Sequence, residues 1–118
     1  MEYLRILGNS TLSNSDFTTI YKVAKAIGGD NARGPIPEAV VGSIILCETN
    51  NVAATVSIRV VPKADTGGNQ HEIFDTLPLA ANGTKIISPG ITLATEDSIE
   101  AKASTTAVNM FVFGSEIK

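Results

Sequence analysis

The sequence predicts an all-β fold, namely a single antiparallel β-sandwich or jelly-roll-like domain of about eight short strands. Three observations predict it. β-Branched residues gather in short runs, and their stiff side chains pack well on a pleated surface. Several runs alternate apolar and polar residues, as half-buried antiparallel strands do. Turn residues separate the runs, and no persuasive amphipathic helix interrupts them.

The stretch from Val40 to Val61 has the strongest strand pattern. Its first run, 44–47, is apolar on both faces, which predicts a central strand covered on each side. Its second run, 55–60, alternates, with Ile58 on the inward face. We predict that the two runs pair as a hairpin across the polar residues 48–51, at the core of the sandwich.

Residues 2–7 form a short strand or an arm, which we expect to end at Gly8-Asn9-Ser10 before a polar spacer. We therefore divide the chain into residues 1–17, an N-terminal arm or edge strand plus spacer, and residues 18–118, the β-sandwich domain. An apolar arm could add a strand to the sheet edge of a neighbour. It could equally be the first strand of its own sandwich, and the sequence leaves both alternatives open.

Residues 18–26 predict the next strand, with Tyr21 and Val23 on one face, and a helix of one or two turns is the competing interpretation. Glycines and prolines then break the chain in residues 28–37. A loop of about ten residues is longer than most connections in compact domains, and such loops often bind partners.

The second half of the chain predicts further short strands separated by turns. Residues 70–79 form one strand, with Ile73 and Leu77 inward. Asn82-Gly83 predicts a hairpin turn after it, because both residues tolerate positive φ. The pair Pro89-Gly90 lies between two short strands, 84–88 and 91–93, and marks a bend or a change of sheet.

The last two predicted strands have the clearest alternation. In residues 97–103, Ile99, Ala101 and Ala103 face inward. The final strand, 108–117, is apolar on both faces, with Phe111 and Phe113 on one of them. This pattern indicates a buried strand, or a strand whose outer face meets another subunit.

Composition argues against several classes of partner. The net charge is −3 and the pI is near 5.0, whereas nucleic-acid phosphates and anionic membranes call for clustered lysine and arginine. We expect no secretory signal, and no apolar run reaches the roughly 18 residues of a membrane span. The single cysteine, Cys47, cannot form an internal disulfide, which suits a protein made in a reducing cytosol.

No set of residues predicts catalysis, a cofactor or a metal. His71, the only histidine, has no G-x-S-x-G nucleophile motif with it, and we expect it at a solvated loop edge. Cys47 lies in an apolar run and indicates a small buried side chain, not a reactive thiolate. Asp65, Asp75 and Asp97 lie near loops but lack the D-x-D-x-D-G series of a calcium loop. We therefore expect no enzyme.

Candidate interface residues come from three places: the apolar N-terminal segment, the loop at 28–37 and the outer face of the last strand. They are Tyr3, Leu4, Ile6, Leu7, Asp30, Asn31, Arg33, Ile36, Phe111 and Phe113.

Several stretches also carry a family resemblance: SIILCETNNVAATVSIRVV (43–61), FDTLPLAANGTK (74–85), ITLATEDSIEAKAST (91–105) and a hydrophobic strand ending in GSEI (114–117). Together they resemble small β-sandwich virion proteins of tailed bacteriophages, which include capsid decoration (cement) proteins and accessory proteins of the neck and tail. The resemblance covers most of the chain, and these motifs determine the fold. The loop at 28–37 departs from it, because a shorter link is expected there.

The resemblance implies a non-enzymatic virion structural protein without a cofactor. The leading hypothesis is a decoration protein that binds the major capsid protein and stabilises contacts between its subunits, as a homo-oligomer and most simply a trimer. It would be made in the host cytoplasm and would end in the virion. One alternative is a head–tail, neck or tail accessory protein. An alternative of another class is a carbohydrate- or receptor-binding module, which the absence of tryptophan argues against.

Overall fold

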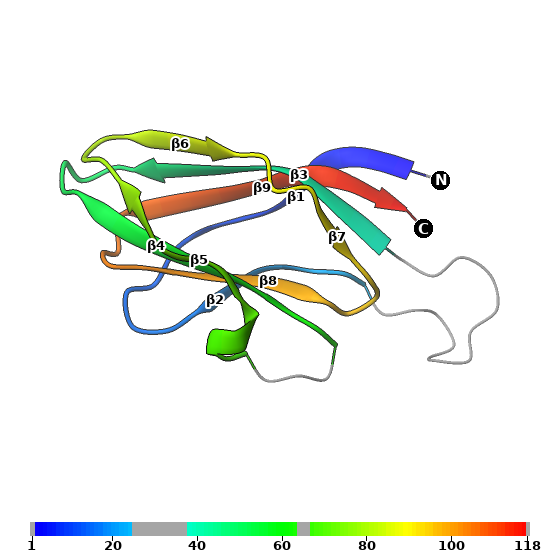
Figure 1. Ribbon diagram of the computed structural model, residues 1–118. Coiled ribbons are helices and arrows are strands. Elements are labelled where there is room, and N and C mark those ends of the chain that lie inside the picture. The colour runs from blue at the N-terminus through cyan, green and yellow to red at the C-terminus, as the bar shows by residue number, and fades with distance from the viewer. Residues whose placement is uncertain (1, 25–37, 64–66, 118) are drawn as a thin grey trace.

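The computed structural model describes residues 2–24, 38–63 and 67–117, and in them two antiparallel sheets pack face to face. Sheet A has the strand order β1-β9-β3-β6, with β7 also paired to β3, and sheet B has the order β2-β8-β4-β5. Figure 1 shows the two layers, with the start of β1 beside the end of β9. The predicted β-sandwich is confirmed. The elements are β1 (Glu2–Thr11), β2 (Thr18–Lys22), β3 (Glu38–Glu48), β4 (Ala54–Val61), the 3₁₀ helix η2 (Asn69–His71), β5 (Glu72–Leu79), β6 (Thr84–Ile87), β7 (Ile91–Leu93), β8 (Ser98–Ala103) and β9 (Val108–Ile117).

The core between the sheets is aliphatic and follows the predicted alternation. The inward residues of β8, Ile99, Ala101 and Ala103, are buried as predicted. Tyr21 in β2 and Val23 just after it are both buried as predicted, and residues 18–22 form a strand, not a helix. Alternation therefore predicted most of the core. Other fully buried core side chains include Val41, Ile44, Leu46, Val56, Ile58, Leu93, Val108, Met110 and Val112.

The predicted hairpin of β3 with β4 is wrong. β3 lies inside sheet A between β9 and the β6–β7 edge, whereas β4 lies inside sheet B between β5 and β8. The two strands thus lie in different sheets. This arrangement buries Ile44 of β3 and Ile58 of β4 on opposite sides of one interior, whereas a hairpin would place both strands in a single layer.

Asn82-Gly83 forms a turn, but the predicted hairpin is wrong here as well. The turn carries the chain from β5 in sheet B to β6 in sheet A, with Asn82 at φ 53° and the Gly83 N–H donating to the Ala80 carbonyl at 2.8 Å. Pro89-Gly90 marks a bend without a change of sheet, because β6 and β7 both pair with β3.

The chain crosses from one sheet to the other between β3 and β4 and again between β5 and β6, and Glu48 links these two crossings. It is buried at the end of β3, and its carboxylate accepts hydrogen bonds from the backbone N–H groups of Asn50 (2.8 Å), Val52 (3.1 Å) and Asn82 (2.9 Å). The Asn82 side chain exchanges hydrogen bonds with Asn51: its Oδ1 accepts from the Asn51 N–H and its Nδ2 donates to the Asn51 Oδ1, both at 3.1 Å. Asn51 and Asn82 both have positive φ, which asparagine tolerates well.

The alternation predicted for β5 fails at one residue. Leu77 packs against the core as predicted, but Ile73 points outward with 44% of its surface exposed, and Phe74 packs inward in its place. The β4–β5 ladder shifts register twice, and Thr76 has φ 53°, so the strict two-residue period is lost. The sequence alone does not reveal these shifts.

The N-terminal segment was expected to be either an arm that reaches a neighbour or a strand of its own sandwich. In the structure it is a strand of its own sandwich. β1 pairs with β9 from Glu2 to Thr11 and continues through Gly8, where the strand was expected to end. A bulge between Ile6 and Gly8 preserves the pairing. A Cβ at Gly8 would collide with the Ile20 carbonyl, so this glycine admits the β2 backbone beside β1. The division of the chain after residue 17 stays a prediction.

Candidate protein interface

A group of five neighbouring apolar side chains lies on the outer face of sheet A, and we call this group the sheet A face. It comprises Ile6, Ile45, Ile86, Phe111 and Phe113. Alternation places Ile45 and Phe111 on this outer face, because the residues on either side of them point into the core. Ile44 and Leu46 on either side of Ile45 are fully buried, as are Met110 and Val112 on either side of Phe111.

Strand register makes the sheet A face continuous. Ile6 lies opposite Phe113, and Ile45 lies between Phe111 on one side and Ile86 on the other. The Phe111 and Phe113 rings stack with their centroids 6.1 Å apart. The face thus crosses sheet A from β1 to β6, and its two ends are exposed, Ile6 by 53% and Ile86 by 68%.

Polar contacts link the strands at one end of the sheet A face. The Thr11 hydroxyl donates to the Asn109 side-chain oxygen at 2.7 Å, across β1 and β9. The Thr84 hydroxyl lies 3.8 Å from the Cys47 sulfur, across β3 and β6. A contiguous apolar patch on the surface of a protein commonly marks a site of contact with another protein. The outer side of sheet A is therefore suited to contact with another protein.

The structure places some of the predicted interface residues on the sheet A face. Ile6, Phe111 and Phe113 belong to it, whereas Leu7 packs against the core. Ile45 and Ile86 were missed, and the β-strand period around them was the only signal that could have placed them. The interface role itself stays a prediction. Of the other predicted interface residues, Tyr3 and Leu4 lie in β1, and Asp30, Asn31, Arg33 and Ile36 lie outside the described residues.

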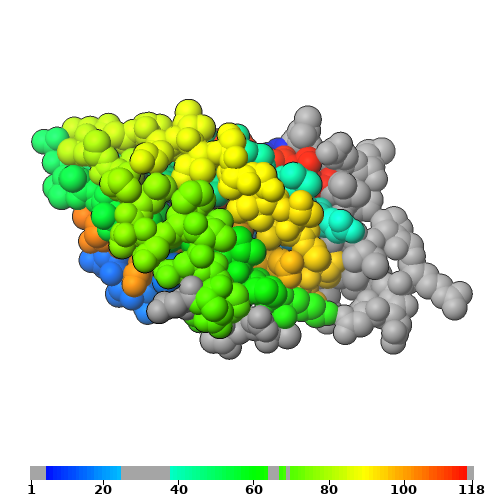
Figure 2. Space-filling view, in the orientation of Figure 1, coloured from blue at the N-terminus to red at the C-terminus, as the bar shows by residue number. Residues whose placement is uncertain are grey.

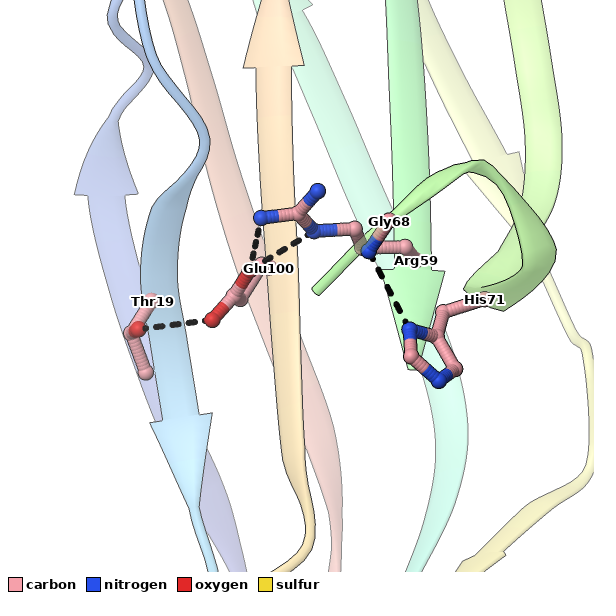
Figure 3. A network of polar contacts seen from close by, with 5 residues as sticks. All are labelled: Thr19, Arg59, Gly68, His71 and Glu100. Carbon is pink, nitrogen blue, oxygen red and sulfur yellow. Dashed lines mark hydrogen bonds and ion pairs between the residues drawn. The ribbon is translucent and has the colours of Figure 1, made fainter. Parts of the chain in front are cut away.

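The outer face of sheet B is polar and is organised by an ion pair. Arg59 on β4 contacts Glu100 on β8, with Nε and the terminal nitrogen 2.7 and 2.6 Å from one carboxylate oxygen. The other carboxylate oxygen accepts from the Thr19 hydroxyl of β2 at 3.4 Å. Figure 3 shows this chain of contacts crossing three neighbouring strands. Because both charged side chains are more than four-fifths buried, the contact links the strands.

The Arg59 guanidinium is also covered on its faces. Its Cζ lies 3.8 Å from the centre of the Phe17 ring, a cation–π contact. A Cβ at Gly67 would collide with the guanidinium, so the absence of a side chain lets the loop lie against Arg59. In the same loop the Gly68 N–H donates to His71 Nδ1 at 3.2 Å (Figure 3). His71 therefore helps to shape the loop before β5.

Replacing Glu100 with glutamine should lower the free energy of unfolding by about 1–2 kcal/mol, because Arg59 would stay largely buried without a matching charge. Urea denaturation measures the change. Glu96→Gln is the matched control: its carboxylate lies 3.3 Å from Lys63 Nζ in a more exposed pair, so it should cost less than about 0.5 kcal/mol. Equal losses in the two variants would contradict the structural role of the Arg59 contact.

A hydrogen bond also crosses from sheet B to sheet A, where an ion pair continues it. The Tyr21 hydroxyl donates to Glu116 Oε2 at 2.5 Å, and Glu116 Oε1 lies 3.3 Å from Arg5 Nε. Burial, together with the hydrogen bond to Glu116 and its negative charge, raises the pKa of Tyr21 well above the usual 10.0. The phenol therefore keeps its proton and acts as a fixed link between the two layers.

Asp97, one of the three aspartates considered for metal binding, has other contacts. Asp97 accepts hydrogen bonds from the Ala94 N–H at 3.0 Å and the Lys63 N–H at 2.9 Å, which shapes the turn before β8. Asp65 lies outside the described residues. Within residues 2–24, 38–63 and 67–117, no three His, Cys, Asp or Glu residues are grouped to hold a metal ion. Within the same residues, no helix is long and apolar enough to cross a membrane.

The protein is a β-sandwich in which the outer face of sheet A carries a group of apolar side chains. No family model matches the chain, and no curated protein matches it. Among solved structures, a chain in the structure of infectious bursal disease virus, Gx strain, aligns with 99% of this chain and 31% of its own length, at 12% identity and a TM-score of 0.48. A chain from the Gt strain aligns over 99% and 32%, at 13% identity and a TM-score of 0.38.

This chain therefore spans about a third of the length of these two viral chains (31% and 32%). The similarity is too low to carry an argument about function. A tailed-phage origin stays a prediction, and so do the decoration role and the trimer.

Proposed function

We propose that this chain is a non-enzymatic structural protein of a tailed-phage virion, and specifically a capsid decoration protein that binds the major capsid protein. The sheet A face is the observation that carries the proposal. Five contiguous apolar side chains on a rigid sheet offer a surface that a coat subunit can cover, and their exposure in the isolated chain has no structural benefit of its own.

The ionisable groups that meet in the described residues support a structural role. Glu48 binds backbone N–H groups, Glu100 pairs with Arg59, and Glu116 binds Tyr21. Each of these contacts joins two or more strands or crossings. They stabilise a rigid unit, which is what a protein that reinforces a lattice requires.

Attachment to a lattice also relaxes the affinity that each contact needs. A homo-oligomer presents several copies of the sheet A face at once, and linked contacts raise the overall affinity by effective concentration. A modest apolar patch on each copy is then sufficient for stable decoration.

The test is binding of purified protein to particles that lack it. Ile86→Lys places a charge at the exposed end of the sheet A face and should weaken binding to capsids by about tenfold or more. Ile73→Lys is the matched control, because Ile73 is also an exposed strand isoleucine but lies on sheet B. It should bind like the unaltered protein. Cosedimentation with particles gives both affinities.

Two other results would replace the proposal. Labelling of tails with bare heads, seen by electron microscopy, would favour the neck or tail accessory alternative. Binding to a glycan array, with no binding to particles, would favour the carbohydrate- or receptor-binding module. Equal binding by the Ile86 and Ile73 variants would remove the sheet A face from the contact.

A further inference from the structure

We propose that β1 is a dimerisation edge, at which two copies of this chain pair β1 with β1 in antiparallel orientation about a two-fold axis. The two A sheets then become one continuous sheet. This inference deepens the proposed function and rests on it for the homo-oligomer, because it names the strand through which copies assemble. It specifies a two-fold dimer in place of the trimer that the resemblance implies. The partner is a second copy of this chain.

A comparison of the sheet edges in the described residues singles out β1. Proteins protect exposed edges with short strands, prolines and irregular backbone. On one side of the molecule, β5 contains Pro78 and the left-handed Thr76, and β6 and β7 are short strands separated by Pro89-Gly90. Figure 2 views this side, with β5 beside the segment from β6 to β7.

The other side of the molecule has β2 and β1 at its edges. β2 has five residues and a register shift. β1 has ten residues, contains no proline, and in the described part of the chain pairs only with β9. Its one irregularity is the bulge between Ile6 and Gly8. β1 is thus the longest edge and the one with the least protection.

The sequence of β1 is compatible with pairing to itself in one long register. Strands in a sheet must keep residues of one face opposite residues of the same face. Ile6 and Asn9 lie on the outer face, opposite Phe113 and Phe111 of β9. Leu7 and Gly8 both point inward, Leu7 against the core and Gly8 against Ile20.

A two-fold axis between Leu7 and Gly8 satisfies this rule. It places Ile6 opposite Asn9 of the second copy, and Leu7 opposite Gly8, so that outer residues meet outer residues and inner residues meet inner ones. Arg5 then faces Ser10 of the second copy, and no two like charges are opposed along the strand. The bulge lies next to the axis, so the bulges of the two copies are adjacent to each other.

The pairing also extends the sheet A face. Ile6 lies at the free edge of sheet A with 53% of its surface exposed, next to Phe113. In the dimer the two copies of Ile6 flank the axis, and the two sheet A faces join across it. A dimer would thus present about twice the apolar surface to a coat subunit in one plane, with the hydrogen bonds of the edge satisfied.

Sedimentation equilibrium of three charge variants tests the dimer and its register. The unaltered protein should sediment as twice its chain mass of 12.3 kDa. The double substitution Ile6→Lys with Asn9→Lys opposes two ammonium groups at two places in the pairing and should give monomers. Ile6→Lys with Asn9→Glu opposes opposite charges instead and should restore the dimer. Ile86→Lys, at the far edge of sheet A, should leave the dimer intact.

Crosslinking gives a second readout that does not depend on charge. In a Cys47→Ala background, mixing chains carrying Ile6→Cys with chains carrying Asn9→Cys should give a disulfide-linked dimer, whereas neither variant alone should crosslink efficiently. Monomeric unaltered protein, a dimer that survives both lysine substitutions, or crosslinking of the Ile6 variant with itself would overturn the proposal. The Ile86→Lys particle assay is independent of these results, so failure of the dimer and failure of decoration are distinguishable.

Discussion

Replacing Gly114 with alanine should destabilise the sandwich by about 3 kcal/mol or more, because the new methyl group has no room to fit. A Cβ at Gly114 would collide with the Val40 carbonyl oxygen and lie 3.0 Å from its carbon and 3.1 Å from the Val41 Cα. These are backbone atoms of β3, which is held on both sides within sheet A. They cannot move aside as a flexible side chain would.

Gly42→Ala is the matched control for this prediction. Gly42 lies on β3 at the same irregularity in the β3–β9 ladder, but the nearest atom to its Cβ position is the Phe113 carbonyl oxygen at 3.9 Å. The added methyl group would make an ordinary contact, so we expect a change of less than about 0.5 kcal/mol. Urea denaturation of the two variants measures both values. Similar stabilities would show that β9 does not approach β3 as closely as the structure describes.

The sequence predicted the strands better than it predicted their partners. Alternation is a local property, so the inward residues Ile99 and Ile58 were identified correctly. Pairing is not local. The run of β3 followed by β4 has the pattern of a hairpin, and so does Asn82-Gly83, yet both turns cross between sheets. What distinguishes a crossing from a hairpin here is the buried carboxylate of Glu48, whose contact with Asn82 joins residues far apart in the chain.

The candidate site was predicted in part for the same reason. Phe111 and Phe113 could be assigned to an outer face because the opposite face of β9 is also apolar. Ile45 and Ile86 could not be joined to them, because that required knowing that β9, β3 and β6 are neighbours in this order. A surface patch that spans several strands depends on the order of those strands in the sheet. The sequence shows only which residues of each single strand share a face.

Replacing Glu48 with glutamine should strongly destabilise the protein, because the site contains only hydrogen-bond donors. Oε1 accepts from the Val52 and Asn82 N–H groups, and Oε2 accepts from the Asn50 N–H. A glutamine can keep one oxygen in place, but its amide NH₂ would then face an N–H group at the other position. The buried donors would be left without an acceptor, and both crossings between the sheets would lose their common anchor. Thermal and urea unfolding should both show the loss.

Glu38→Gln is the matched control, since Glu38 lies at the opposite end of β3 and is exposed. It should leave stability almost unchanged. A Glu48 variant as stable as the Glu38 variant would show that the crossings do not depend on this carboxylate.

The pH dependence gives a test of the charge itself. The N–H group of Asn82, with those of Asn50 and Val52, lowers the pKa of Glu48 below its usual 4.5, although burial acts in the opposite direction. Because the folded-state pKa is the lower one, the stabilising contribution is complete above pH 4.5 and is lost as the pH falls through the folded-state value. The stability difference between the unaltered protein and Glu48→Gln should therefore be constant near neutral pH and shrink on acidification below pH 4.5. A difference independent of pH would mean that shape, and not the negative charge of the carboxylate, holds the crossings together.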